Sequence, residues 1–94
     1  SGIETKVEEA TSRGRIDMVV QMPKYVFLFE LKVDQTADIA LDQLHAQNYK
    51  KRYLHGGKQI VAVGINFSTQ SRDINDWKAG LYTSEGAEIR SLSQ

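Results

Sequence analysis

The sequence predicts one α/β domain of the α+β type, built on a small mixed β-sheet of four to six strands with a crossover helix. Three observations predict it: β-branched runs separated by short turns, one long segment with helical periodicity, and a nearly continuous apolar run after that segment. A helix between two extended runs provides the crossover that parallel strands require, whereas runs joined by a tight turn pair antiparallel. We therefore expect both kinds of pairing in one sheet.

Three strands are predicted before the helical segment. Residues 5–10 are expected to form a short strand, followed by a turn that contains Gly14. Residues 15–21 and 25–33 are rich in β-branched and aromatic residues, and Pro23 lies in the short connection between them. We expect these two strands to form an antiparallel hairpin.

A helix is predicted from about residue 37 to about residue 54, with Thr36 as its N-cap and Gly56-Gly57 beyond its end. Its apolar residues fall into two stripes, which predicts that the helix contacts the sheet on one side and a neighbouring element on the other. The first stripe is Ala37, Ala40, Leu41 and Leu44, and the second is Ile39, Ala46, Tyr49 and Tyr53.

The second half of the chain is predicted to complete the sheet. Residues 59–67 are almost continuously apolar, as expected of a central strand that is buried on both faces. A polar loop over residues 68–73 precedes a strand expected at residues 76–83. Residues 88–92 are expected to add a short edge strand.

Composition restricts the classes of protein that this chain can belong to. Its 94 residues suffice for one domain, and its Ser1-Gly2 start resembles a processed end, which suggests a fragment of a longer protein. Twelve acidic residues balance twelve basic ones, so a nucleic-acid partner must be recognised locally. The absence of cysteine excludes disulfides and thiolate metal sites. No apolar run is long enough to span a membrane, and we expect a soluble, cytoplasmic protein without a membrane partner.

Three charged residues on the predicted hairpin carry the candidate chemistry. Glu30 and Lys32 share one face of their strand, about 7 Å apart, among apolar neighbours. A hairpin turning at Pro23 places Asp17 on the adjacent strand, about 4.8 Å from Glu30. Two carboxylates at that spacing repel each other unless a cation lies between them, and hard oxygen ligands suit Mg²⁺ or Mn²⁺. The alternative is a structural salt bridge between Glu30 and Lys32.

Four motifs follow one another along the chain: Gly14-Arg15-Ile16-Asp17, a hydrophobic strand ending in Glu30-Leu31-Lys32, a helix with Gln43 before Tyr49 and Tyr53, and a strand with Ile60-Val61-Ala62-Val63-Gly64-Ile65-Asn66-Phe67-Ser68. In this order they resemble the PD-(D/E)XK nuclease superfamily over roughly residues 9–77. The chain looks closest to the prokaryotic branch in which a nuclease-like domain follows an AAA-type ATPase-like domain. The resemblance implies a restriction-endonuclease-like core with the first helix of that fold missing.

The resemblance also implies roles for individual residues. Asp17 and Glu30 would bind one or two divalent metals, with the main-chain carbonyl of Leu31 as a further ligand. Lys32 would orient or deprotonate the attacking water and stabilise charge on the phosphate. Gln43 would position the water, the substrate backbone or Lys32. The implied reaction is hydrolysis of phosphodiester bonds.

Two departures from the family pattern bear on further residues. Members of the superfamily usually have a helix before the first strand, often with an additional acidic residue, and here Glu9 is a candidate for that role or a solvated surface residue. The spacing from Gln43 to Tyr49 differs from the commonest version in related exonucleases, so Tyr49 is a possible additional site residue. Lys50-Lys51-Arg52 and Lys58 either contact phosphate or are placed by the helix dipole.

Three functional hypotheses follow. The first is a metal-dependent nuclease that acts on DNA, or less favourably RNA, and is coupled to an ATPase-like domain in the full-length chain. The second is a nuclease-like module that binds nucleic acid or regulates its partner with little hydrolysis of its own. The third is an interaction domain that pairs with other copies through an exposed sheet edge.

Overall fold

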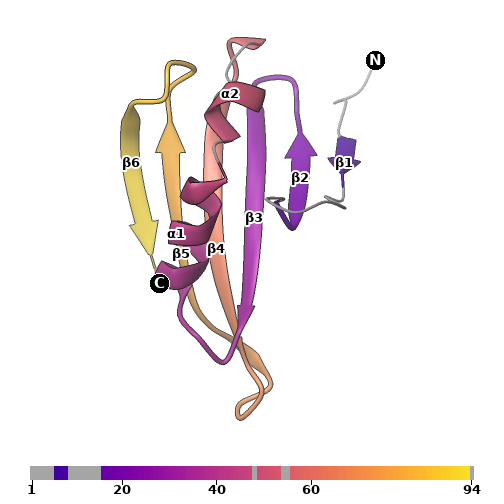
Figure 1. The fold of residues 1–94 in the computed structure, drawn as a ribbon, viewed down its shortest axis with the longest axis vertical. Coiled ribbons are helices and arrows are strands. Elements are labelled where there is room, and N and C mark those ends of the chain that lie inside the picture. Colours follow the sequence, from indigo (N-terminus) through magenta and orange to yellow (C-terminus); the bar gives the residue numbers. More distant parts are fainter. Residues whose placement is uncertain (1–5, 9–15, 48, 54–55, 94) are drawn as a thin grey trace.

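The computed structural model describes residues 6–8, 16–47, 49–53 and 56–93. One six-stranded sheet runs through the domain, with the strands in chain order across it (Figure 1). The elements are β1 (Lys6–Glu8), β2 (Met18–Gln21), β3 (Tyr25–Val33), α1 (Ala37–Ala46), α2 (Tyr49–Tyr53), β4 (Gln59–Ser68), β5 (Asp73–Tyr82) and β6 (Glu88–Ser93). The predicted α+β class and the number of strands are confirmed.

Strands β2 and β3 form the expected antiparallel hairpin. Their register pairs Met18 with Phe29 and Val19 with Leu28. The turn between them is closed by a main-chain hydrogen bond from Met22 to Tyr25, 2.8 Å long. Pro23 lies inside this turn, where its fixed φ angle is favourable and its missing N–H costs no sheet hydrogen bond.

Strands β3 and β4 are parallel neighbours, and α1 lies in the crossover between them. Every other adjacent pair in the sheet is antiparallel. The predicted mixed sheet is therefore confirmed. The parallel pair lies near its centre, where Glu30 is in register with Gly64 and Lys32 with Asn66.

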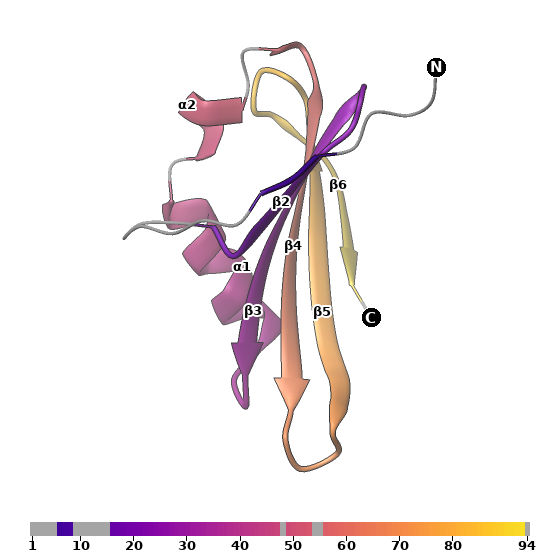
Figure 2. The same ribbon diagram turned by 90° about the vertical axis from the view of Figure 1, so that its right-hand side faces the viewer.

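Both helices lie on the same side of the sheet, as the view along its edge shows (Figure 2). The core lies between α1 and the sheet, and its largest fully buried side chains include Leu28, Leu44, Ile60 and Tyr49. On the opposite face, no described element covers the sheet, and Leu31 there remains 50% exposed. None of the described helices has both the length and the apolar character that a membrane span needs.

The start of α1 is tied to the sheet by side chains from distant parts of the chain. Thr36 caps the helix, because its Oγ1 accepts a hydrogen bond of 3.1 Å from the main-chain N–H of Ile39. The main-chain N–H of Ala37 donates to Asp76 Oδ2 on β5 at 2.9 Å. Lys78, also on β5, forms an ion pair of 2.6 Å with Asp38. These contacts fix the helix against β4 and β5.

The middle of α1 lies unusually close to β4. A Cβ atom at position 64 would lie 2.7 Å from the main-chain oxygen of Ala37 and 2.8 Å from the main-chain nitrogen of Leu41. Both are atoms of the helix backbone, which cannot move aside as a flexible side chain can. Glycine at position 64 therefore sets how near α1 can approach the sheet.

The predicted single helix over residues 37–54 was wrong. Helix α1 ends at its C-cap, Gln47, whose main-chain N–H bonds to the oxygen of Leu44 instead of the residue four positions back. This tighter turn changes the direction of the chain before α2 begins. The break allows Tyr49 to become buried, whereas Ile39, from the same predicted stripe, is 45% exposed.

Three strand predictions also need correction. The strand expected at residues 15–21 begins only at Met18, because Ile16 and Asp17 precede its first regular pair with β3. Strand β4 alternates between buried and half-buried residues, because α1 covers only one of its faces; the expectation of burial on both faces was wrong. Strand β5 starts at Asp73, three residues before the predicted start, because Phe67 pairs with Ile74 and Ser68 with Asp73 beyond a register shift. The edge strand predicted at residues 88–92 is confirmed as β6.

Substituting Gly64 by alanine should destabilise the fold, because the added methyl group meets helix backbone at 2.7–2.8 Å. We expect the free energy of unfolding to fall by about 2 kcal/mol or more, as in other overpacked cores. Urea denaturation followed by circular dichroism measures the change. Gly56→Ala is the matched control, since its Cβ would meet only Lys58 Cγ at 3.9 Å. Equal stability of the two variants would contradict the proposed close approach.

Candidate metal centre

The hairpin register brings the two predicted carboxylates opposite each other. Met18 pairs with Phe29, so Asp17, one residue earlier, faces Glu30, one residue later, on the neighbouring strand. Asp17 is exposed, and its Oδ2 accepts a hydrogen bond of 2.9 Å from the main-chain N–H of Leu31. This bond extends the hairpin beyond the last regular pair and holds the Asp17 carboxylate beside β3.

Glu30 is the unusual residue of this pair, since it is charged and only 3% exposed. It lies on the face of β3 that also carries Val26 and Leu28, directly under α1. Its Oε1 atom is buried and has no hydrogen-bond partner among the described residues. An unsatisfied buried carboxylate oxygen is costly, and a cation bound at this atom would offset the cost.

The electrostatic environment of Glu30 opposes its ionisation. Burial is the main cause that raises the pKa of Glu30 above its ordinary value of 4.5, and the negative charge of Asp17 acts in the same direction. The positive charge of Lys32 and the main-chain N–H of Asp17 act against them but do not cancel them. A second positive charge close to both carboxylates would offset the effects of burial and of the Asp17 charge on Glu30.

Lys32 occupies the same face of β3, one pleat beyond Glu30, and is half-buried. Within the described part of the chain, no ion pair joins Lys32 to Glu30. The structural salt bridge considered as an alternative is therefore not formed. The ammonium group of Lys32 remains available for a ligand at the same edge of the site.

The donor set fits a hard divalent cation. Mg²⁺ in particular is commonly held by one or two carboxylates together with water and substrate phosphate. Asp17, Glu30 and the Leu31 carbonyl provide such a set, and the unsatisfied Oε1 of Glu30 is the atom that a cation would satisfy. Among the described residues, no cluster of three or more metal-ligating side chains occurs. Within the described ranges, the further ligands of a site here would be main-chain oxygen, together with water or substrate.

The other predicted residues lie in different surroundings. Gln43 is half-buried on α1, and in the described part of the chain it forms no hydrogen bond with Asp17, Glu30 or Lys32. Tyr49 is 1% exposed and belongs to the core, where burial raises the pKa of its hydroxyl. Glu9 falls outside the described residues, as does the position before Thr5 where a first helix would lie.

Tyr49 contributes to a hydrogen-bonded group at the other end of the core. His45 bonds to the Tyr49 hydroxyl through Nδ1 at 3.0 Å and to the Tyr82 hydroxyl through Nε2 at 3.1 Å. Tyr82 is in register with Ile60, four residues before Gly64 on β4, and Gly64 is the partner of Glu30. The hydrogen bonds of this group do not include Asp17, Glu30 or Lys32 among the described residues.

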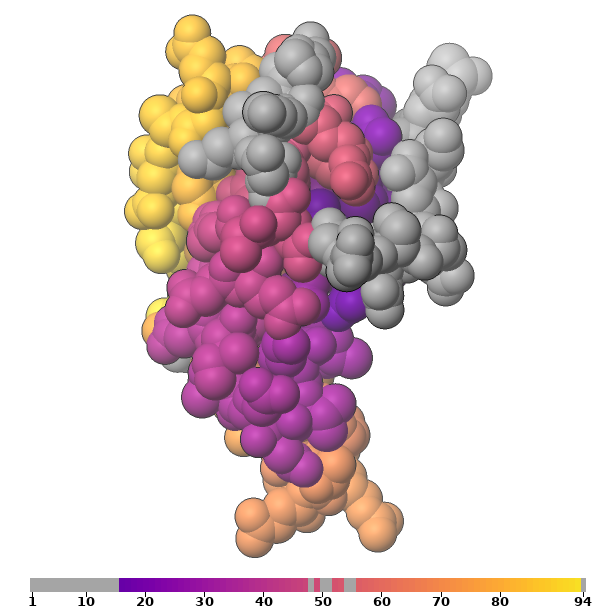
Figure 3. All heavy atoms as spheres, in the orientation of Figure 1, coloured from indigo at the N-terminus to yellow at the C-terminus, as the bar shows by residue number. Residues whose placement is uncertain are grey.

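Sequence reasoning missed two residues that support the site. Asn66, 2% exposed and in register with Lys32, accepts from the Gln35 main-chain N–H at 2.8 Å and donates to Asn75 Oδ1 at 3.0 Å. Asp76 binds the first N–H of α1. Together they hold the β3–α1 loop beside Lys32. The polar Asn66 inside an apolar run was a signal for this role, whereas Asp76 gave none. Figure 3 shows the face of the domain that carries α1. The helix lies over the middle of this face, and the β4–β5 turn protrudes beyond it.

Comparison with known proteins identifies a family for this chain. The sequence model of the PD-(D/E)XK nuclease superfamily matches residues 1–77. A curated relative from Azotobacter chroococcum mcd 1, named "Uncharacterized protein in vnfD 5'region", is 41% identical over 75 residues, which cover 78% of this chain and 14% of the relative. The chain therefore spans about one seventh of the length of that relative. No solved structure matches the chain.

Glu30→Gln should stabilise the metal-free protein at pH 7, because the variant removes a buried negative charge. Glutamine keeps an oxygen for the Asp17 N–H and adds an NH₂ group that can donate to the Asp17 carboxylate. We expect the free energy of unfolding to rise by about 1–2 kcal/mol. Urea denaturation in the presence of EDTA measures it.

The pH dependence of this gain has a definite sign. Since the pKa of Glu30 is raised in the folded protein, its contribution to stability is fully present at pH values below 4.5 and is lost as the pH rises above that value. The advantage of Glu30→Gln should therefore be absent in acid and grow towards neutral pH. Glu85→Gln, in an exposed turn, is the control. A pH-independent difference would show that charge is not the cause.

Proposed function

We propose that this chain, which belongs to the PD-(D/E)XK nuclease superfamily, is a metal-dependent nuclease domain that hydrolyses phosphodiester bonds. DNA is the proposed substrate, with RNA less favoured. The observation that carries the proposal is the pair of carboxylates on β2 and β3, of which Glu30 is buried with an unsatisfied oxygen. A purely structural glutamate would be expected to have its oxygens paired.

The proposed catalytic roles follow from the positions of the side chains. Asp17 and Glu30, with the Leu31 carbonyl, would hold Mg²⁺ or Mn²⁺; when bound, such a cation polarises the phosphate and lowers the pKa of a coordinated water. Lys32 lies one pleat further along the same face, so its ammonium group is placed to hold the attacking water and to stabilise negative charge on the phosphate. Gln43 has no partner in this group and is proposed to contact substrate only.

The wider biological setting is also a proposal. The chain covers 14% of its curated relative, which leaves room there for further domains. We propose that one of these is an AAA-type ATPase-like domain, that the protein acts in the cytoplasm, and that nucleic acid is its macromolecular partner. The order of the motifs supports the first statement, the absence of cysteine is in keeping with the second, and the family match supports the third.

Calorimetric titration of Mn²⁺ or Mg²⁺ into the chain tests the metal site. We expect one saturable binding process, with the dissociation constant raised about 100-fold or more in Asp17→Ala and Glu30→Gln, since each variant removes an anionic ligand. Asp42→Ala, which removes an exposed carboxylate from α1, should bind like the wild type. Unchanged binding in the Asp17 and Glu30 variants would refute the site.

Cleavage of a labelled DNA oligonucleotide tests the role of Lys32. Lys32→Ala should bind metal like the wild type but cleave at least about 100-fold more slowly, the loss expected when one group that stabilises transition-state charge is removed. Arg90→Gln, an exposed cation on β6, is the control for loss of charge. Metal binding with no cleavage by the wild type would instead favour a nuclease-like binding or regulatory module.

A further inference from the structure

The face of the sheet opposite the two helices is apolar and open. Six of the eight large hydrophobic residues that are exposed in the described part of the chain lie on this open face. They are Met18, Tyr25, Leu31, Val33, Ile74 and Leu92, and each is between 37% and 51% exposed. Monomeric soluble proteins rarely expose so many large apolar side chains side by side, whereas surfaces that bind another protein commonly do.

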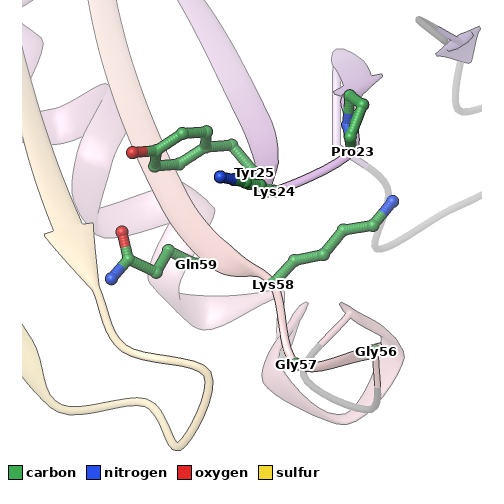
Figure 4. A pocket seen from close by; sticks show the side chains of 7 residues that line it. All are labelled: Pro23, Lys24, Tyr25, Gly56, Gly57, Lys58 and Gln59. Atoms are coloured by element: carbon green, nitrogen blue, oxygen red, sulfur yellow. The ribbon is translucent and has the colours of Figure 1, made fainter. Parts of the chain in front are cut away.

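Strand alternation places a row of aromatic rings on the open face. Leu28 lies under α1, so Tyr25, Phe27 and Phe29 point to the opposite side of β3. Their ring centroids are 6.1 and 6.3 Å apart along the strand. Figure 4 shows the first of these rings, Tyr25, pointing to the same side as its register partner on β4, Gln59. Aromatic residues are enriched at the centres of protein interfaces, where they supply much of the contact area.

The open face carries little charge. On strands β2 to β6, every residue of which the structure describes, the register places one charged residue on this side, Arg90 opposite Leu81. The charges of the central strands, among them Glu30, Lys32 and Lys78, lie on the side of α1. A nucleic-acid surface would need several cations. In a symmetric dimer the same surface meets itself, so a nearly uncharged surface avoids repulsion between like charges.

The open face is large enough for a stable contact between two proteins. Strands β2 to β6 hold about forty residues, and each takes up about 3.3 Å along a strand and 4.8 Å across it, so the face measures about 600 Å². Two such faces in contact would bury about 1,200 Å² in total, which reaches the range of specific, stable interfaces. Interdigitating side chains would bury more than this flat projection.

The width of the open face indicates the kind of element that covers it. Its exposed apolar residues are spread from β2 to β6, five strands that together are about 24 Å wide. A single helix, about 10–12 Å in diameter with its side chains, would leave about half of that width open. A second sheet of the same size would cover all of it, and sheets pack face to face through such apolar surfaces.

We propose that the open face packs against the same face of a second copy of this chain and forms a symmetric dimer. The two sheets would lie about 10 Å apart with their strands at roughly 30° to each other. In each copy, α1 and the Glu30 carboxylate lie on the outer side of the sheet, so both candidate metal centres stay accessible (Figure 2). The inference goes beyond the proposed nuclease function and does not depend on it.

Sedimentation equilibrium of the wild-type chain over a range of concentrations tests the proposal. We expect the mass to rise from that of one chain to that of two and then to stay constant, with a dissociation constant of about 10 µM or lower. The same result is expected in EDTA and in Mg²⁺, since no metal ligand lies on the open face.

Tryptophan fluorescence reports which surface is buried. Trp77 is the single tryptophan of the chain, and as the register partner of Ile65 it lies half-buried on the open face. Its emission should move to shorter wavelength as the dimer forms, because the indole ring loses contact with water. The concentration at the midpoint of this shift should equal the dissociation constant from sedimentation.

Two charged variants and a matched control locate the interface. Val33→Glu and Leu92→Lys each place an unpaired charge of both copies in the dimer, so each should raise the dissociation constant about 10-fold or more. Both side chains are about half exposed in the single chain, and circular dichroism checks that the variants fold. Ile39→Glu and Ile39→Lys make the same changes at a side chain 45% exposed on α1 and should dimerise like the wild type.

Several outcomes would overturn the proposal. The mass of one chain at every concentration would show that a second copy does not cover the open face. A dimer that forms without a change in Trp77 emission would indicate pairing through an edge strand. Association that continues beyond two copies would indicate open-ended aggregation, and a dimer lost in the Ile39 variants but kept in Val33→Glu and Leu92→Lys would place the contact on the helical side.

Discussion

Helix α1 lies so close to β4 that only glycine fits at position 64, and this contact determines how the rest of the domain is arranged. Helix α1 is the crossover between the parallel strands β3 and β4. The position of the helix on the sheet therefore fixes which residues of the two strands lie side by side. Glu30 is the register partner of Gly64 and is therefore covered by the helix. The packing of α1 against the sheet, which stabilises the fold, thus also buries the Glu30 carboxylate.

The burial of Glu30 sets stability against function. A carboxylate 3% exposed beside a second carboxylate costs free energy in the folded protein, and the raised pKa of Glu30 reflects that cost. Hydrophobic contacts between α1 and the sheet, together with the ties from Asp76 and Lys78 to the helix, offset it. Functional sites commonly retain such unfavourable groups because a ligand, once bound, reverses the penalty.

Much of this architecture could be predicted because its signals are local. Alternation placed Glu30 and Lys32 on one face, and the short turn at Pro23 set the hairpin that faces Asp17 to Glu30. The break after α1 could not be predicted, because the helical periodicity continues past Gln47 and only tertiary packing draws Tyr49 into the core. The contacts of Asn66 and Asp76 with the start of α1 join residues 31 and 39 positions apart in the chain, so no sequence window contains them.

Strand β3 carries Glu30 and Lys32, and its regularity has a mechanical consequence. It pairs along its whole length with β4 and over its first half with β2, without a register shift in either ladder. A strand bonded in this way behaves as a rigid spacer, since any change in its length would break several hydrogen bonds at once. The separation between Glu30 and Lys32, which share one face of β3, is therefore fixed. Under the proposed nuclease function, Lys32 therefore stays one pleat from the carboxylate that would hold the cation, as a phosphate ligand shared by both requires.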